Sequence, residues 1–266
     1  MTKVCSFLEI SKSWYYEMKA SIERKKEEEK AILTAVRQIR AEHHAYGTKK
    51  LWKQLERDGI TIGRDRLHHL LKKHGYILPR HYKKVRTSFP GIYDQGFENK
   101  LKGLTVDHIN QVWCTDITYI HTAEGMLYLS AMMDVYSRKI ISLNISNNLR
   151  TDGSLDCLNK ALKQVSDASG IMHHSDHGTQ YCSYRYLNKL SSHGMQISFT
   201  GKDHCYDNAK IERFFNTLKY EYVLKGVVKT KKLAIEMIKN AINDYNYKRL
   251  HAALGYKIPY EVYDAA

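Results

Sequence analysis

In the second half of the chain, apolar residues first recur at every second position, as in strands. Further along, they also recur with the period of a helix. Runs rich in β-branched and aromatic residues predict strands, and the short connections at 123–125 and 136–138 suit antiparallel hairpins. Helical and strand-like runs alternate after them. The predicted strands are 111–121, 126–135, 139–146, 170–174 and 196–200, and the predicted helices are 151–166, 180–192 and one that Asp207 or Asn208 caps. This order predicts a mixed α/β sheet.

The first half of the chain has a helical period and predicts a small all-α domain. Helices near 26–43, 48–57 and 64–74 each bury one apolar face. Three short helices with a tight turn before the last resemble a helix-turn-helix, whose final helix enters the major groove. We therefore expect this helix to contact DNA, although an exposed basic helix without base contacts explains each residue equally well. The candidates are Arg64, Arg66, His68, Lys72 and Lys73.

Two further segments flank this helical domain. Residues 3–18 predict two short helices around a turn at Ile10 and Ser11, and residues 79–110 lose the helical period and predict a basic linker. The linker either follows a DNA backbone or is simply solvated. The predicted organisation is a partial helix-turn-helix or helical arm at 1–25, a helix-turn-helix domain at 26–78, the linker at 79–110 and an α/β domain at 111–266.

The charge distribution favours a polyanionic partner. The chain carries a net charge of +14. Residues 1–105 hold 23 Lys and Arg against 12 Asp and Glu, a net of +11, which leaves +3 for residues 106–266. Neutralising phosphates with basic side chains releases condensed counterions. The asymmetry indicates a DNA-gripping module joined to a catalytic one, with a solubilising basic surface as the alternative.

Cysteine and histidine usage argues against a structural metal site. The five cysteines form no Cys-x-x-Cys pair, so we expect free thiols and no zinc knuckle. The histidine pairs 43–44, 68–69 and 173–174 have no cysteine pair at ligand spacing, and we expect them to be solvated or to face DNA. No apolar run approaches the roughly 18 residues of a membrane helix. We expect a soluble, cytosolic protein without a membrane partner.

Three acids are the candidate catalytic residues. Asp116 lies within the first predicted strand of the α/β domain, Asp176 follows a strand, and Glu212 lies in the first turns of a helix. Oxygen ligands on separate elements can converge on divalent metal, and Mg²⁺ takes one or two carboxylates per ion. Taken singly, each acid is more typical of a solvated surface charge.

The helix that carries Glu212 presents a second candidate. Ile211, Phe215 and Leu218 form its apolar stripe, and Lys219 lies seven residues after Glu212 on an adjacent stripe. Lys219 can therefore face a DNA phosphate from the same surface, while an ordinary polar helix face is the alternative. Asp134 ends a strand before a turn, and we expect it to be structural.

Five stretches in this order carry a family resemblance: Trp113–Tyr119, Asp134–Arg138, His174–Tyr181, Cys205–Ala209 and Tyr245–His251. Between Asp176 and Glu212 lie 35 residues (212 − 176 − 1). The chain resembles the retroviral integrase superfamily with its Asp-Asp-Glu triad. It is more similar to the transposase encoded by the second reading frame of many bacterial insertion sequences. The matching stretches span roughly residues 112–260.

The resemblance implies a ribonuclease H-like mixed sheet, as in the integrase catalytic core, behind the helix-turn-helix domain. Asp116, Asp176 and Glu212 would hold two Mg²⁺ ions, for which Mn²⁺ can substitute, and Arg249 and His251 would hold DNA ends. The expected partners are the terminal inverted repeats of the element, a target duplex and further copies of the chain on DNA. A fusion to, or pairing with, an upstream-frame protein is also expected. The expected location of the protein is the bacterial cytoplasm, in association with the nucleoid.

Two other functions remain open at this point. A metal-dependent nuclease would cut DNA without joining it. A catalytically silent regulator would use only the helix-turn-helix and the basic linker to bind DNA.

Overall fold

The computed structural model describes residues 11–79, 98–201, 208–222, 224 and 226–265. The chain divides into two compact units, residues 1–83 and 84–266. Each has its own buried apolar core. Within the described ranges, no helix is both long and apolar enough to cross a membrane.

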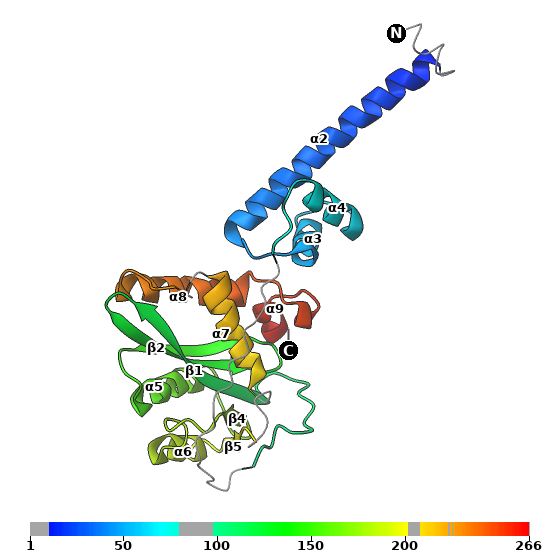
Figure 1. Cartoon of the computed structure of the whole chain (residues 1–266). Helices are drawn as coiled ribbons and strands as arrows, with labels where there is room; N and C mark the ends of the chain where they lie inside the picture. The colour runs from blue at the N-terminus through cyan, green and yellow to red at the C-terminus, as the bar shows by residue number, and fades with distance from the viewer. Residues whose placement is uncertain (1–10, 80–97, 202–207, 223, 225, 266) are drawn as a thin grey trace. The chain divides into compact units, whose positions relative to one another are not determined.

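The first unit contains α2 (Lys12–Glu42), α3 (Thr48–Arg57) and α4 (Arg64–Lys73) (Figure 1). Most apolar positions predicted from the helical period are buried between these helices, and Ile39 and Trp52 are half-buried. The all-α assignment is confirmed. The buried side chains are Ile32, Leu33, Val36, Leu51, Leu55, Leu67, Leu70 and Leu71.

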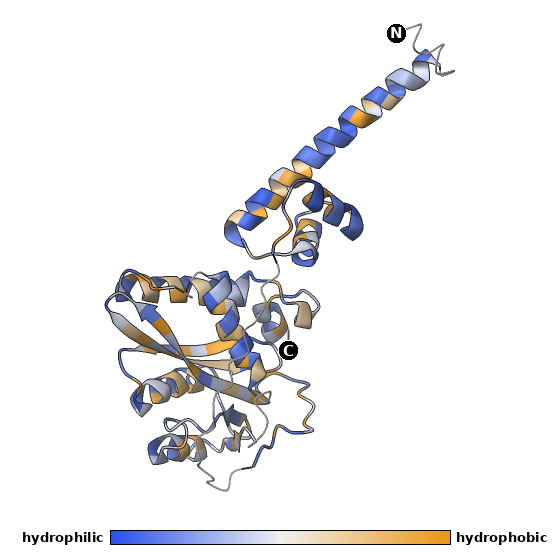
Figure 2. Cartoon of the chain, in the orientation of Figure 1, coloured by the Kyte–Doolittle hydropathy of each residue, from blue (hydrophilic) through white to orange (hydrophobic). Residues whose placement is uncertain are grey.

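Helix α2 corrects the prediction for the start of the chain. It runs through 31 residues without a break, so the expected boundary between residues 25 and 26 falls inside it. Its N-cap is Ser11, whose hydroxyl accepts the Trp14 N–H at 3.0 Å. The charged stretch 23–30 continues the helix because it lacks Gly and Pro and places opposite charges three residues apart. Figure 2 shows this stretch as mostly hydrophilic. Residues 3–10 lie outside the described residues.

The second unit is built on a five-stranded mixed sheet in the order β3-β2-β1-β4-β5. The two hairpin pairs, β1 with β2 and β2 with β3, are antiparallel, whereas β1 with β4 and β4 with β5 are parallel. The strands are β1 (Val112–Thr122), β2 (Gly125–Asp134), β3 (Ile140–Ser146), β4 (Met172–Ser175) and β5 (Gln196–Phe199). The predicted mixed sheet and both hairpins are confirmed.

Helices cover both faces of this sheet (Figure 1). Side chains alternate along a strand, so β1 sends Trp113 into the core with α5 and α6, and Cys114 into the core with α7 and α8. The helices are α5 (Thr151–Leu162), α6 (Tyr184–Ser191), α7 (Ala209–Glu221), α8 (Lys231–Tyr247), the 3₁₀ turn η1 (Ala252–Leu254) and α9 (Pro259–Asp264). The sequence pattern did not predict the elements after α7.

Candidate active site

Asp116 lies where two strands of the sheet separate. The ladder between β1 and β4 pairs Cys114 with His174 and continues no further, whereas β1 remains paired with β2 along its whole length. Asp116 is half-buried just beyond this point. Its Oδ1 atom accepts the N–H of Ile117 at 2.7 Å.

Asp176 follows β4 directly and is exposed. Its Oδ1 atom accepts the Gly178 N–H at 3.0 Å. A Cβ atom on Gly178 would lie 3.0 Å from the same oxygen, so a larger residue would displace the carboxylate. The parallel strands β4 and β1 therefore bring Asp176 and Asp116 to the same edge of the ladder.

Glu212 lies in the first turn of α7 and is exposed. The helix is held on the sheet by its predicted stripe, because Ile211, Phe215 and Leu218 are all buried. Asn208 occupies the N-cap position, but its side chain makes no capping bond. The capping prediction is therefore wrong for the Asn208 side chain, and Asp207 lies outside the described residues.

The electrostatics of Asp116 show that the three acids share one neighbourhood. Burial, together with the negative charges of Asp176 and Glu212, raises the pKa of Asp116 to about 7, against the opposing effects of the Ile117 N–H and the Lys219 ammonium. Burial lowers the pKa of Lys219, and Asp116 opposes that shift. The carboxylates repel one another across this edge of the sheet, which is the situation that a bound cation relieves.

The donor set fits an oxygen-preferring divalent cation. The three candidate acids offer carboxylate oxygens, which suit Mg²⁺ or Mn²⁺ better than zinc. In the part of the chain that the structure describes, no three His, Cys, Asp or Glu side chains stand close enough together to hold an ion. Asp176 and Glu212 are exposed, whereas Asp116 is half-buried.

Asp134 has the structural role that the sequence predicted. It is fully buried at the end of β2. Its carboxylate accepts the N–H and hydroxyl of Ser137 at 2.7 and 2.6 Å and the N–H of Asn110 at 2.8 Å. These bonds lower its pKa, but burial has the larger effect and raises it. Asp134 therefore holds the β2–β3 turn.

Arg249 and His251 lie inside the protein, which argues against the expectation that they hold DNA ends. Both are buried. The guanidinium of Arg249 binds both carboxylate oxygens of Glu221 at 2.7 Å and lies beside the His251 ring. The bidentate pair uses two of the three guanidinium nitrogens, and the third lies against the His251 ring. A role of Arg249 and His251 in holding DNA ends stays a prediction, and the burial of both side chains argues against it.

The histidines of β4 also differ from the expectation of solvated or DNA-facing rings. His173 and His174 are buried. His173 Nε2 lies 2.9 Å from the Tyr186 hydroxyl, and His174 Nδ1 lies 3.0 Å from the Ser198 hydroxyl. Burial lowers the pKa of His173 to about 3, so its ring is neutral. Their position on a strand buried on both faces explains this.

The DNA-contact candidates of α4 are exposed, and several also hold the helix in place. Arg66 binds both carboxylate oxygens of Glu28 at 2.9 and 3.0 Å, and Lys73 binds Glu29 at 3.0 Å. Arg64 pairs with the neighbouring Asp65, and His68 lies 3.4 Å from the Thr48 hydroxyl. Their contacts with DNA, and those of Lys72, remain predictions.

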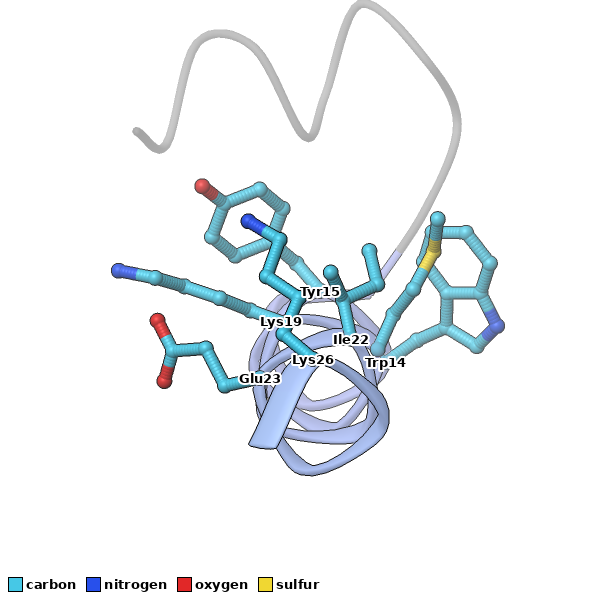
Figure 3. Close-up of a pocket in the computed structure, with 7 residues that line it drawn as sticks. Trp14, Tyr15, Lys19, Ile22, Glu23 and Lys26 are labelled. Atoms are coloured by element: carbon cyan, nitrogen blue, oxygen red, sulfur yellow. The ribbon is translucent and has the colours of Figure 1, made fainter. Parts of the chain in front are cut away.

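A shallow hollow on the first turns of α2 is not a catalytic candidate. Figure 3 shows its lining as side chains of a single helix. Trp14, Met18 and Ile22 are 48, 45 and 42% exposed there. The lining offers one carboxylate, Glu23, between Lys19 and Lys26.

The sheet order and the acids on β1, after β4 and on α7 define an integrase-type core. Two integrase core domain models match residues 107–205 and 193–259, and an HTH-like domain model matches residues 26–84. A chain of a simian T-cell lymphotropic virus intasome, solved in complex with the PP2A regulatory subunit B56 gamma, has the same fold. It aligns with a TM-score of 0.50 and 15% identity over 85% of this chain and 73% of that one.

Curated relatives are more similar in sequence. The transposase for insertion sequence element IS904 of Lactococcus lactis is 33% identical over 88% of this chain and 94% of its own length. A 31 kDa protein of insertion element IS600 from Shigella sonnei is 32% identical over 95% of this chain and 94% of its own. The chain belongs to the family of insertion-sequence transposases with an integrase core.

Proposed function

We propose that this transposase cleaves the ends of its insertion sequence and joins them to a target duplex at Asp116, Asp176 and Glu212. The observation that carries the proposal is the placement of Asp116 and Asp176 just beyond the end of the β1–β4 ladder, with Glu212 in the first turn of α7. Burial, together with the charges of the other two acids, raises the pKa of Asp116. Perturbed acids from separate elements in one place are typical of a catalytic site. The family membership supplies the reaction class.

The three acids would together hold the metal ions of the site. Two Mg²⁺ ions, or Mn²⁺ in their place, would activate the attacking oxygen and stabilise the departing 3′-oxygen. In cleavage, water attacks the phosphorus, the bond to the 3′-oxygen breaks, and a 3′-hydroxyl end remains. In joining, that hydroxyl attacks a target phosphodiester, loses its proton and releases the target strand's own 3′-hydroxyl.

The remaining residues would bind and orient the DNA. Lys219 lies beside Asp116 at the edge of the site, where its ammonium can hold a phosphate near the acids. The exposed basic side chains of α4 would grip the terminal inverted repeats. Joining two ends to one target requires several copies on DNA, and we extend the proposal to a homo-oligomer that works fused to, or paired with, an upstream-frame protein.

A joining assay tests this function. A pre-cut inverted-repeat end with a labelled 3′-hydroxyl is incubated with the full chain and Mg²⁺, with the upstream-frame partner added if the element encodes one. We expect products longer than the substrate on a denaturing gel. Asp176→Asn should abolish them. Asp156→Asn, the same chemical change at an exposed acid on α5, is the matched control and should not.

The assay also separates the two other candidate functions. Shortened products alone, with the ends bound, would favour a nuclease that cuts without joining. Bound DNA with no chemistry in either Mg²⁺ or Mn²⁺ would favour a silent regulator.

A further inference from the structure

Asn208 links the start of α7, which carries Glu212, to the strand that carries Asp116. It is 4% exposed and directly precedes α7. Its Nδ2 atom donates to the main-chain carbonyl oxygen of Thr115 at 3.0 Å. Thr115 is the residue immediately before Asp116, so one side chain connects the start of α7 to the middle of β1.

The Thr115 carbonyl is the place where the β1–β4 ladder stops. In that ladder the Gln111 carbonyl accepts the Met172 N–H at 3.0 Å. The same spacing, continued along both strands, would pair the Thr115 carbonyl with the N–H of Asp176. Strand β4 instead ends at Ser175, and the Asn208 amide takes the vacant position. A buried carbonyl needs such a donor.

The same residue also fixes Glu212. The main-chain carbonyl of Asn208 accepts the Glu212 N–H at 3.3 Å, which is a first bond of helix α7. Asn208 is thus bonded to the residue before Asp116, occupies the hydrogen-bonding position of Asp176 and starts the turn that carries Glu212. Its own Oδ1 atom is buried and has no hydrogen-bond partner in the described ranges. An unpaired buried oxygen costs free energy. This cost is consistent with a side chain whose role is the hydrogen bond of its Nδ2 atom.

We propose that Asn208 is a positioning residue that sets the spacing of Asp116, Asp176 and Glu212. Its Nδ2 atom gives the Thr115 carbonyl a hydrogen-bond donor, so Asp176 need not pair with β1. The same bond anchors the end of α7 that carries Glu212. The inference rests on the proposed metal-dependent function, because the spacing matters for holding cations. Groups that orient metal ligands typically change metal affinity by 10- to 100-fold when they are removed.

The test compares Asn208 with a matched residue in the same domain. Asn246 is also buried, and its Nδ2 atom donates to the Ile140 carbonyl at 3.0 Å, a bond of the same kind between α8 and β3. Asn208→Leu and Asn246→Leu each remove one buried amide from the full chain with little change in volume. Asn208→Ser is a smaller change that also removes the donor, and it serves if Asn208→Leu does not fold.

The first readout is Mn²⁺ binding by the DNA-free protein, followed by electron paramagnetic resonance. We expect Asn208→Leu and Asn208→Ser to raise the half-saturating Mn²⁺ concentration about tenfold or more, and Asn246→Leu to leave it unchanged. The second readout is cleavage at saturating metal. Its kcat should fall about 100-fold in the Asn208 variants because the acids are misplaced, while gel-shift binding of DNA stays unchanged.

The possible outcomes distinguish a failure of the positioning role of Asn208 from a failure of the proposed transposase function. Asn208 variants that match Asn246→Leu in metal affinity, and lose only thermal stability, would overturn the positioning role while the proposed function stands. A wild-type protein that binds no Mn²⁺ and cleaves nothing would overturn the proposed function and the inference with it.

Discussion

The charge of Asp176 raises the pKa of Asp116, although the two residues belong to different strands, β4 and β1. This coupling arises because the parallel ladder of β1 and β4 ends just before both residues, at Cys114 and His174, and leaves both carboxylates at one edge. Without a cation, the ionised carboxylates therefore destabilise the folded chain. This destabilisation can be measured as a change in the free energy of unfolding.

The first prediction concerns the metal-free stability of Asp116→Asn. The pKa of Asp116 is about 7 in the folded chain against an ordinary 3.8. A carboxyl group with a raised folded pKa favours folding when protonated, so its contribution is present below about pH 4 and is lost as the pH rises through 7. At pH 8 we expect Asp116→Asn to have a free energy of unfolding on the order of 2 kcal/mol higher than wild type, after discounting for partial exposure.

Urea unfolding with EDTA at pH 8 and near pH 4 measures this difference. The gain should shrink towards zero at the lower pH. An equal gain at both pH values would mean that the ionisation of Asp116 is not its cause.

The second prediction concerns metal dependence. Asp176→Asn and Glu212→Gln should each lower Mg²⁺-dependent strand cleavage by about 10³-fold or more, and the double variant should be little worse, because the ligands act as one unit. DNA binding by gel shift should be unchanged. Glu236→Gln, at an exposed acid on α8, controls for loss of negative charge. EDTA should reproduce the loss in the wild type, and cleavage retained by either single variant would remove that residue from the site.

The third prediction follows from the ion pair of the buried Arg249 with the half-buried Glu221. Removing Arg249 leaves the Glu221 carboxylate without this partner and removes a buried side chain, so Arg249→Ala should lower the free energy of unfolding by about 2 kcal/mol. Arg185 and Asp152 form an exposed pair at 2.8 Å, and Arg185→Ala should cost less than about 1 kcal/mol. Denaturant unfolding measures both. A loss of DNA affinity in folded Arg249→Ala, with no loss of stability, would restore the DNA-contact role that the burial of Arg249 argues against.

The fourth prediction concerns the basic face of α4. Lys72→Ala and Arg64→Ala should each weaken binding to duplex DNA and reduce the slope of log K against log salt by about 1, as expected when one phosphate contact is lost. Fluorescence anisotropy at several salt concentrations gives the slope. Lys163→Ala, at an exposed residue that follows α5, should leave it unchanged. Equal slopes for all three variants would mean that α4 does not contact phosphates.

The sequence predicted the strands, the hairpins and the buried stripe of α7 because these are set by local periods. The stripe of Ile211, Phe215 and Leu218 is buried as expected. Local signals failed where an element is long or lies deep in the fold. The predicted boundary between residues 25 and 26 falls inside the continuous helix α2. No period distinguishes the buried pair His173 and His174 from a surface pair.

The three acids and their order along the chain were determined by the sequence itself, because carboxylate chemistry and element type are both visible in it. Tertiary structure decided which groups share one environment. Asn208 differs from an ordinary cap only because α7 packs where the β1–β4 ladder stops. Arg249 differs from a DNA-binding arginine because it is buried and paired with the half-buried Glu221. Hydrogen bonds and ion pairs between residues 28 or 93 positions apart depend on three-dimensional packing, which no local pattern encodes.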